Sequence, residues 1–446
     1  MNKKKILLIS DDIRSGSGVG NISKELILGT AYKYDWVQLS TAIKHPQEGS
    51  ILNVSKAVDV EAGIEGSNVE LVPCSNKTST DLKFVVNAID LKKPDLILLF
   101  GDPHLFRDLL KSNKVIREKA PIAYLNIWDN LPIPRFNKTV YESVDVLLPI
   151  SRLTEYINKE VLKEVPEKPG IHYLPHGRST KSFFKIRERD DKFKTLQSFR
   201  KALLEGQEKD FVVFSNVRNI VRKEVGVAME GFLRFCKQIE GTEKDVLYVI
   251  HTSPLDPQGP DLYAVRDILE QEYGVYGKVK FSAELVQEDT LNLLYNVADV
   301  VLQTSSNEGW GLSLTESLLT GTPFIATATG GMLDQMNIPV TGKLIKGEFT
   351  KHGEWCVPLL PESYRIVGSN QTPYIYESLI TLTQISQKLQ TYFLLDKKRR
   401  EEDGLKGLKW VSEKTNGYTS ENMCNRFVEV VEEELNKLQE SKISGL

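Results

Sequence analysis

Short apolar runs alternate with longer mixed segments along the first part of the chain. The runs are rich in leucine and β-branched residues and have the length of strands. The expected strands are residues 6–10, 36–40, 69–72, 96–100, 122–126, 146–150 and 171–174. Residues 81–92 space their apolar side chains as a helix does, just before one of these strands. Alternating strands and helices of this kind predict a parallel sheet in an α/β fold.

The strand pattern stops at a charged stretch, residues 185–194, and then begins again. The second set of expected strands is 211–215, 246–250, 279–281, 300–303 and 323–326, followed by helical segments at 384–392 and 420–439. A chain of 446 residues exceeds what one hydrophobic core usually holds. We therefore expect a first domain at 1–185, a second at 186–415, and a C-terminal helix at 416–446 whose apolar stripe must pack on another surface.

Composition narrows the class of protein. The apolar runs are far shorter than the ~20 residues that cross a bilayer, and the basic start of the chain lacks the apolar stretch of a secretory signal. Four cysteines lie far apart without a Cys-x-x-Cys pair, and six histidines show no His-x-x-x-His spacing. These observations predict a reduced, cytoplasmic protein without a metal site.

The segment after the expected strand 300–303 has the most distinctive sequence. Glycines around Glu308 open a loop, and good helix formers then continue to Gly321. A strand, a glycine loop and a helix N-terminus form an anion site, because free backbone N–H groups and the helix dipole favour phosphate. If the helix starts near Leu312, Glu316 lies in its first turns and Glu308 on the loop. The spacing alone allows two interpretations: both acids bind a ligand, or Glu316 offsets the helix dipole and Glu308 is an exposed loop acid.

The stretch Glu308-Gly-Trp-Gly-Leu-Ser-Leu-Thr-Glu316, followed by Gly321-Thr-Pro323 and Gly330-Gly331, resembles a known donor-site signature. It is that of the retaining GT-B glycosyltransferases, which include sucrose and glycogen synthases and many mannosyltransferases. The resemblance implies two Rossmann-like domains facing across a cleft, with the C-terminal helix crossing back to the N-terminal domain.

The same resemblance assigns roles to residues of the second domain. It implies that Glu308 binds hydroxyls of the donor sugar and that Glu316 binds the ribose of the nucleotide. Arg218 and Lys223 match a basic pair that neutralises the leaving diphosphate, which would need no metal. The backbone on the diphosphate would be that of Gly309, Gly311, Leu312 and Ser313.

Glycines also follow the first expected strand, at Gly16, Gly18 and Gly20. Their spacing departs from Gly-x-Gly-x-x-Gly, and no ribose-binding acid follows about 20 residues later, so a dinucleotide site is disfavoured. In the family that the chain resembles, a glycine loop at this place closes over the donor, which implies that role for Gly16 and Gly18.

Polar residues follow two further strands of the first domain, where α/β sheets bind ligands. Asp102 and His104 come after one strand and Asp129 after the next. Many relatives place a histidine near this second position, where the ionisable residue here is Asp129. These three side chains are expected either to orient the acceptor hydroxyl or, for the two aspartates, only to cap loops.

Together these features predict a retaining, metal-independent glycosyltransferase that uses a nucleotide-sugar donor such as a UDP- or GDP-sugar and no cofactor. The acceptor would be a glycan, a lipid-linked compound or a small molecule. A phage-type enzyme acting on hydroxymethylated bases in duplex DNA is a second hypothesis, which the small basic excess of the first domain permits. A GT-B epimerase, a phosphorylase and a non-catalytic homologue are weaker hypotheses for the same pattern.

Overall fold

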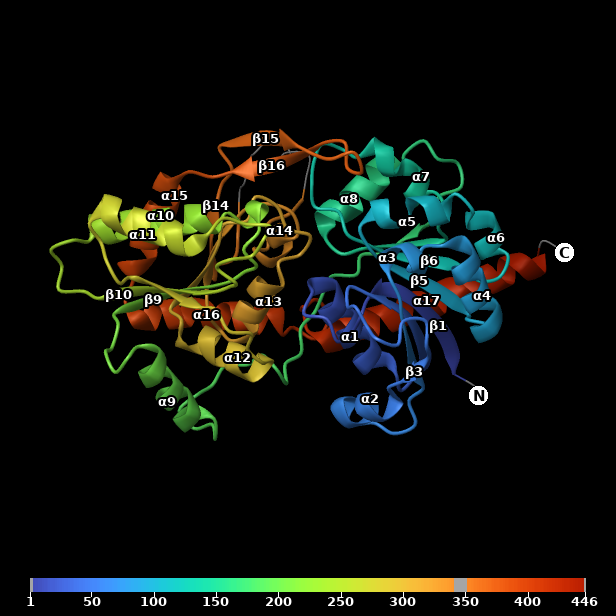
Figure 1. Ribbon diagram of the computed structural model, residues 1–446, viewed down its shortest axis with the longest axis horizontal. Helices are drawn as coiled ribbons and strands as arrows, with labels where there is room; N and C mark the ends of the chain where they lie inside the picture. The colour runs from blue at the N-terminus through green and yellow to red at the C-terminus, as the bar shows by residue number, and fades with distance from the viewer. Residues whose placement is uncertain (1–2, 341–350, 445–446) are drawn as a thin grey trace. The chain divides into compact units, whose positions relative to one another are not determined.

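The computed structural model describes residues 3–340 and 351–444 of the chain (Figure 1). The contacts divide the chain into two compact units. Unit 1 comprises Met1–Gly177, Gly368–Ile375 and Tyr418–Leu446, and unit 2 comprises Arg178–Val367 and Tyr376–Gly417. Each unit is built on its own parallel sheet, as the two sets of apolar runs predict. In the described residues, no helix is long and apolar enough to cross a membrane.

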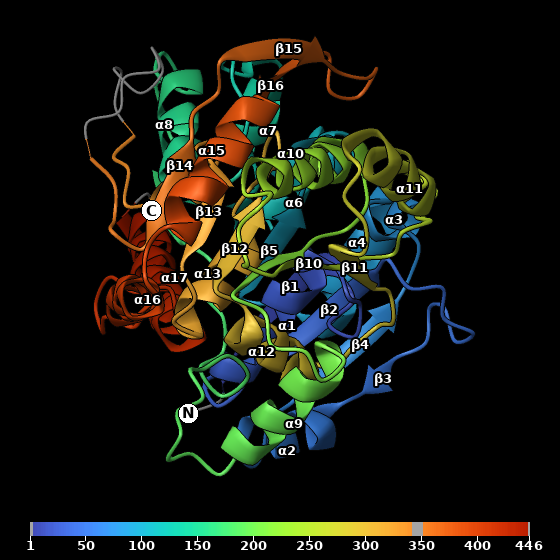
Figure 2. The same ribbon diagram turned by 90° about the vertical axis from the view of Figure 1, so that its left-hand side faces the viewer.

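The sheet of unit 1 has the strand order β3-β4-β2-β1-β5-β6-β7-β8, and Figure 2 shows β4, β2, β1 and β5 side by side. All neighbours are parallel except β3, which runs antiparallel to β4. The strands are β1 Lys4–Asp11, β2 Tyr34–Thr41, β3 Leu52–Asn53, β4 Val69–Pro73, β5 Leu96–Gly101, β6 Ile122–Asn126, β7 Val146–Pro149 and β8 Gly170–Ile171. The central strands β5 and β6 are buried throughout, which explains their continuous apolar runs.

One strand is shorter than its sequence suggests. The apolar run predicts an extended segment over residues 171–174, but β8 ends at Ile171. His172 and Leu174 still donate backbone hydrogen bonds to Leu147 and Pro149 of β7, at 2.9 Å each. Pro149 has no N–H to donate in return, so the ladder continues in one direction only.

The helices of unit 1 are α1 Gly18–Thr30, α2 Ser55–Ala62, α3 Asn76–Ser79, α4 Leu82–Lys92, α5 Pro103–Leu110, α6 Asn113–Arg117, η1 Arg135–Asn137, α7 Lys138–Tyr141, α8 Arg152–Val161 and α17 Ser420–Ser444. The helix expected at 81–92 is confirmed as α4, with Asp81 capping its N-terminus. The expected return of the C-terminal helix is also confirmed, because α17 packs on α1. Phe427 stacks on Trp36, and Lys4 pairs with Glu432 at 2.7 Å.

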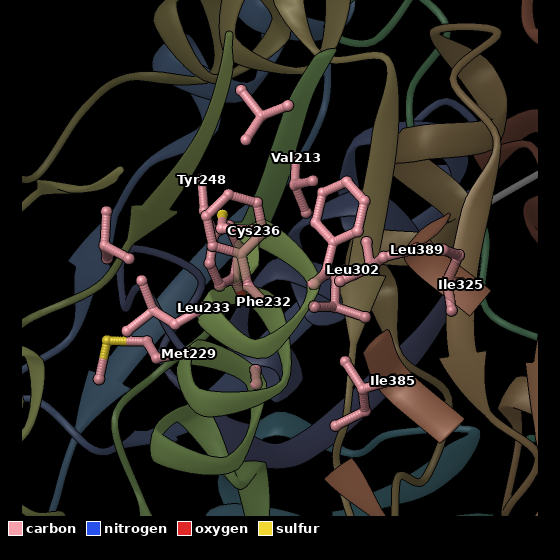
Figure 3. Packing of buried hydrophobic residues seen from close by; sticks show 14 of the residues in the cluster. Val213, Met229, Phe232, Leu233, Cys236, Tyr248, Leu302, Ile325, Ile385 and Leu389 are labelled. Atoms are coloured by element: carbon pink, nitrogen blue, oxygen red, sulfur yellow. The ribbon is translucent and has the colours of Figure 1, made fainter. Parts of the chain in front are cut away.

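The sheet of unit 2 has the order β11-β10-β9-β12-β13-β14, all parallel. Its strands are β9 Phe211–Asn216, β10 Val246–His251, β11 Val279–Ser282, β12 Val300–Gln303, β13 Phe324–Thr327 and β14 Cys356–Leu359. Its helices are α9 Phe193–Leu203, η2 Val221–Lys223, α10 Val225–Gln238, α11 Leu262–Tyr273, α12 Glu288–Val297, α13 Leu312–Leu319, α14 Met332–Gln335, α15 Leu382–Phe393 and α16 Lys397–Val411. Figure 3 shows Phe232 of α10 beside Tyr248 of β10 in the buried core of this unit, with Met229 of α10 in the same cluster.

Two features of unit 2 are not indicated by the sequence. Strand β14 contains Pro358, which interrupts the apolar pattern that would predict a strand. The proline is tolerated because β14 lies at the edge of the sheet. A two-stranded hairpin, β15 Ser363–Val367 and β16 Ile375–Leu379, follows it. Residues Gly368–Ile375, which form the turn and the first position of β16, are grouped with unit 1, where Arg107 donates to the carbonyl of Gln371 at 3.2 Å.

Candidate functional site

The loop between β12 and α13 is held by the side chain of Gln335 in α14 and by the backbone of Gly331 just before that helix. Gly311 is the N-cap of α13 and has φ of 83°, a left-handed conformation that favours glycine. Gln335 donates to the carbonyls of Trp310 and Gly311 at 2.6 and 3.1 Å. Gly331 donates its backbone N–H to the carbonyl of Glu308, and a Cβ on Gly331 would lie 2.2 Å from the Gly309 carbonyl oxygen. The loop is therefore fixed in shape before any ligand binds.

Helix α13 begins at Leu312, where the sequence predicts it. Among the described residues, no side chain caps its N-terminus, and no acidic residue lies in its first turn. The backbone N–H groups of Leu312 and Ser313 belong to the first turn, which has no intrahelical acceptor for them. An uncapped helix start after a glycine loop is suited to bind a phosphate group.

Glu308 lies at the centre of a charged cluster and is only 6% exposed. Its Oε1 accepts hydrogen bonds from the Lys223 ammonium and, at 3.0 Å each, from Gln303 and Ser305. Its Oε2 accepts from Arg222 at 3.2 Å. Burial by itself would raise the pKa of Glu308, but the two basic side chains outweigh it and lower the pKa to about 2. At neutral pH Glu308 is therefore ionised and only accepts hydrogen bonds. The interpretation of Glu308 as an exposed loop acid is wrong.

The basic residues of this cluster follow β9. Lys223 ends the short helix η2 and is 13% exposed, and Glu224 after it takes a left-handed conformation before α10 begins. The structure thus brings Lys223 to Glu308. Arg218, the other basic residue singled out in the sequence, is instead 59% exposed and pairs with Asp256 at 2.7 Å.

The sequence does not indicate Arg222, because the five-residue spacing of the basic pair points to Arg218 and Lys223. The guanidinium of Arg222 donates to both the carbonyl of Asn307 and the carboxylate of Glu308. The one signal for it in the sequence is its position next to Lys223.

Glu316 is 4% exposed and joined to three donors. Its Oε1 accepts from Arg178 at 3.0 Å, and its Oε2 accepts from Tyr295 at 2.7 Å and from Asn216 at 3.2 Å. Burial raises the pKa of Glu316, and Arg178 offsets only part of that rise. A carboxylate has about four acceptor positions, so these bonds leave room for roughly one more donor. The ribose role of Glu316 stays a prediction, and Arg178 is a buried partner that the sequence does not indicate.

The glycine loop of unit 1 joins β1 to α1. Ser17 caps α1 by accepting from the N–H of Gly20 at 2.9 Å, and it donates to Asp11 at 2.6 Å. Gly18 is the first residue of the helix, and Gly16 is exposed, with open space where a Cβ would lie. Their predicted role over the donor is not tested by these contacts.

The three candidate acceptor residues do not share one cavity. Asp102 is the exposed N-cap residue of α5 and lines a cavity of about 170 Å³. His104, in the first turn of α5, and Asp129, after β6, are both partly buried and are not among the lining residues. In the described residues, no group of three or more His, Cys, Asp or Glu side chains is arranged to hold a metal ion.

Comparison with known proteins points to the same region of unit 2. Residues 197–352 match the family model "Glycosyl transferases group 1". This range includes Lys223, Glu308 and Glu316. A D-inositol 3-phosphate glycosyltransferase of Mycobacterium sp. (strain KMS) is 34% identical over 101 residues, which is 22% of this chain and 22% of that protein. One from Corynebacterium urealyticum is 35% identical over 80 residues, 18% of this chain and 19% of that protein. The chain thus matches about a fifth of the length of these curated relatives.

Solved structures match over nearly the whole chain. Anabaena Alr3699/HepE in complex with UDP and glucose aligns with a TM-score of 0.65 at 12% identity, covering 96% of this chain and 100% of that chain. Sucrose-phosphate synthase from Thermosynechococcus elongatus aligns with a TM-score of 0.65 at 16% identity, covering 97% and 99%. At this identity the likeness establishes the fold, which is the GT-B fold.

Proposed function

We propose that the protein is a retaining glycosyltransferase that moves a sugar from a nucleotide-diphosphate sugar to an acceptor hydroxyl. The observation that carries the proposal is the cluster of Glu308, Lys223 and Arg222 on the loop that leads to the uncapped N-terminus of α13. The group 1 family match over residues 197–352 and the UDP and glucose bound by a structural neighbour support it. The donor would be a UDP- or GDP-sugar.

The cluster supplies the two interactions that a sugar diphosphate needs. The amides of Leu312 and Ser313 and the cation of Lys223 would bind the diphosphate. An ammonium has three donors, so Lys223 can hold Glu308 and a phosphate oxygen together. As the bond to the sugar breaks, negative charge grows on the diphosphate, and prepositioned donors stabilise it without reorganising. This charge stabilisation is the basis for proposing that the reaction needs no metal and no cofactor.

Glu308 would bind the sugar and not attack it. The pKa of Glu308 is about 2, and four neighbouring groups donate hydrogen bonds to its carboxylate, so it is a weak nucleophile. An ionised carboxylate nevertheless accepts hydrogen bonds well from sugar hydroxyls. Without a covalent intermediate, retention requires the acceptor hydroxyl to attack from the face that the diphosphate leaves. Glu316 would bind the ribose of the nucleotide, and Arg218, whose side chain is exposed, would turn from Asp256 to the diphosphate.

The acceptor would bind to unit 1, where Asp102, His104 and Asp129 are candidates to orient its hydroxyl. Gly16 and Gly18 of the same unit would close over the donor. A reduced, cytoplasmic setting fits the four cysteines, which are unpaired and buried. The relatives named D-inositol 3-phosphate glycosyltransferase suggest a small hydroxylated acceptor. No feature of the described residues supports a duplex-DNA acceptor.

Proton NMR of the reaction mixture tests both parts of this proposal. The protein is incubated with UDP- and GDP-sugars of α configuration and a panel of hydroxylated acceptors, and the anomeric signals of donor and product are followed. Retention predicts an α-linked product together with release of the nucleoside diphosphate. A β-linked product would contradict retention, and no cleavage of any donor would contradict the transferase assignment.

A further inference from the structure

Glu224, the residue after Lys223, has an uncommon backbone conformation. Its φ is 52° and its ψ is 38°, which is left-handed, and it is the N-cap residue of α10. A Cβ makes this conformation unfavourable, so glycine is the usual residue there. Other residues keep it only where the surrounding structure holds them. The turn at Glu224 joins η2 to α10, so it sets the direction from which Lys223 approaches Glu308.

The side chain of Glu224 is bound by the hairpin β15–β16. Arg365 of β15 donates from Nη2 to Glu224 at 3.1 Å and from Nε to Glu377 of β16 at 2.7 Å. The side chains of Glu224 and Glu377 are only 19% and 10% exposed. A guanidinium carries its donors in a fixed planar fork, so one group can hold both carboxylates in place. Without Arg365 the two carboxylates would repel each other.

The backbone around this turn is also held. Ser378 of β16 donates its N–H to the carbonyl of Ser306 at 3.0 Å, and Ser306 donates its own N–H to the carbonyl of Arg222 at 2.8 Å. The hydroxyl of Thr304 donates to the carbonyl of Glu224 at 3.3 Å. All of these residues belong to unit 2. The hairpin and the β12–α13 loop therefore hold the turn by both its side chain and its backbone.

We propose that Arg365 is a positioning residue of the donor site. By binding Glu224 it holds the left-handed turn, and the turn directs Lys223 towards Glu308. The inference rests on the proposed function, because the direction of Lys223 affects turnover only if this lysine faces the donor diphosphate. It makes a hairpin that the sequence does not indicate part of the machinery for transfer.

Glycine at position 224 separates the turn from the ion pair. Glu224→Gly and Glu224→Ala both remove the carboxylate, but glycine adopts the left-handed conformation without strain. We expect Arg365→Gln to lower turnover at least about fivefold, because strain of this kind is enough to shift an equilibrium by that factor. In Glu224→Gly/Arg365→Gln, turnover should return to within about twofold of wild type. In Glu224→Ala/Arg365→Gln it should stay low, because alanine still has a Cβ and lacks the pair.

Arg399→Gln is the matched control. Arg399 of α16 also pairs with two carboxylates, those of Asp403 at 3.1 Å and Glu354 at 3.6 Å. Its side chain is 47% exposed, against 39% for Arg365. This variant should leave turnover unchanged. Circular dichroism of every variant checks that it is folded.

A second measurement follows Lys223 without any substrate. Ammonium protons of exposed lysines exchange rapidly with water, whereas those of a buried, paired lysine persist long enough to be seen by ¹H–¹⁵N NMR. Wild type and Glu224→Gly/Arg365→Gln should show a Lys223 signal, identified by its absence in Lys223→Met, and Arg365→Gln should lose it. If this pattern is found but wild type cleaves no donor, the proposed function fails and the positioning of Lys223 by Arg365 stands.

Three results would overturn the role of Arg365. One is that Arg365→Gln matches the Arg399→Gln control in turnover and keeps the Lys223 signal. Another is equal turnover of the glycine and alanine double variants, and the third is the absence of a Lys223 signal in wild type. If Arg365→Gln does not fold, the single variants decide: Glu224→Gly should exceed Glu224→Ala in turnover at least about fivefold, and equal turnover overturns the proposal.

Discussion

Replacing Lys223 by methionine separates the structural and catalytic roles of the charged cluster. Methionine keeps an unbranched apolar stem and removes the cation next to Glu308. Breaking a buried pair costs about 3–5 kcal/mol. Here Arg222, Gln303 and Ser305 continue to bind Glu308, so we expect a loss of about 2–3 kcal/mol in the free energy of unfolding.

The catalytic loss has a different origin. Removing one prepositioned group that stabilises developing negative charge lowers kcat by roughly 10²–10³, or about 2.7–4 kcal/mol. Steady-state release of the nucleoside diphosphate measures this loss, and urea denaturation measures stability. Lys237→Met is the matched control, because Lys237 is a half-exposed lysine of α10 that pairs with Glu240.

The double variant Lys223→Met/Glu308→Gln distinguishes the two effects. It removes both charges, so much of the lost stability should return, since no uncompensated carboxylate remains buried. Turnover should not return, because the cation that faces the diphosphate is still absent. Turnover of Lys223→Met within threefold of wild type, or full recovery of turnover in the double variant, would refute the reasoning.

Three further outcomes are expected. Gly331→Ala should distort the loop and lower turnover at least about tenfold. Gly226→Ala in α10, whose Cβ would meet nothing closer than Val265 of α11 at 3.7 Å, should keep activity and gain up to ~1 kcal/mol in the free energy of unfolding. Equal effects of the two substitutions on turnover would contradict the account of the loop. The folded pKa of Glu308, about 2, lies below the ordinary 4.5, so its ionisation stabilises the fold above pH 4.5 and that contribution is lost as the pH falls. Between pH 7 and 4, urea titrations should show wild type losing about 1 kcal/mol more than Glu308→Gln, and parallel losses would disprove the low pKa. Gly29→Ala would place a Cβ 2.4 Å from the Cys424 sulfur between α1 and α17, so the melting temperature should fall. In a Cys424→Ala background the melting temperature should recover. An unchanged melting temperature in Gly29→Ala would count against this contact.

Local sequence patterns predicted most of the fold, because the formation of a strand or helix depends largely on the apolar and polar pattern of neighbouring residues. The buried strands of both sheets have continuous apolar runs, and the start of α13 follows from the glycines before Leu312. Strand β14 was not predicted, because Pro358 interrupts its apolar pattern and only the edge position of the strand makes a proline acceptable there. The hairpin β15–β16 was not predicted, because it is largely exposed and so lacks an alternating buried face.

The candidate site was predictable only in part. The motif indicated Glu308 and Lys223, which the fold brings into contact across 85 residues of sequence. Arg222 and the buried Arg178 depend on tertiary contacts that no spacing rule reveals. The unit 1 cavity likewise joins the ends of strands far apart in the chain.

The most direct test of the donor site is a calorimetric titration of wild type and Lys223→Met with UDP, GDP and ADP. A site made of an uncapped helix N-terminus and a buried lysine should bind at least one of these diphosphates. The variant should bind it at least about thirtyfold more weakly, a difference of about 2 kcal/mol. Binding of none of the three to wild type, or equal affinity in Lys223→Met, would contradict the account.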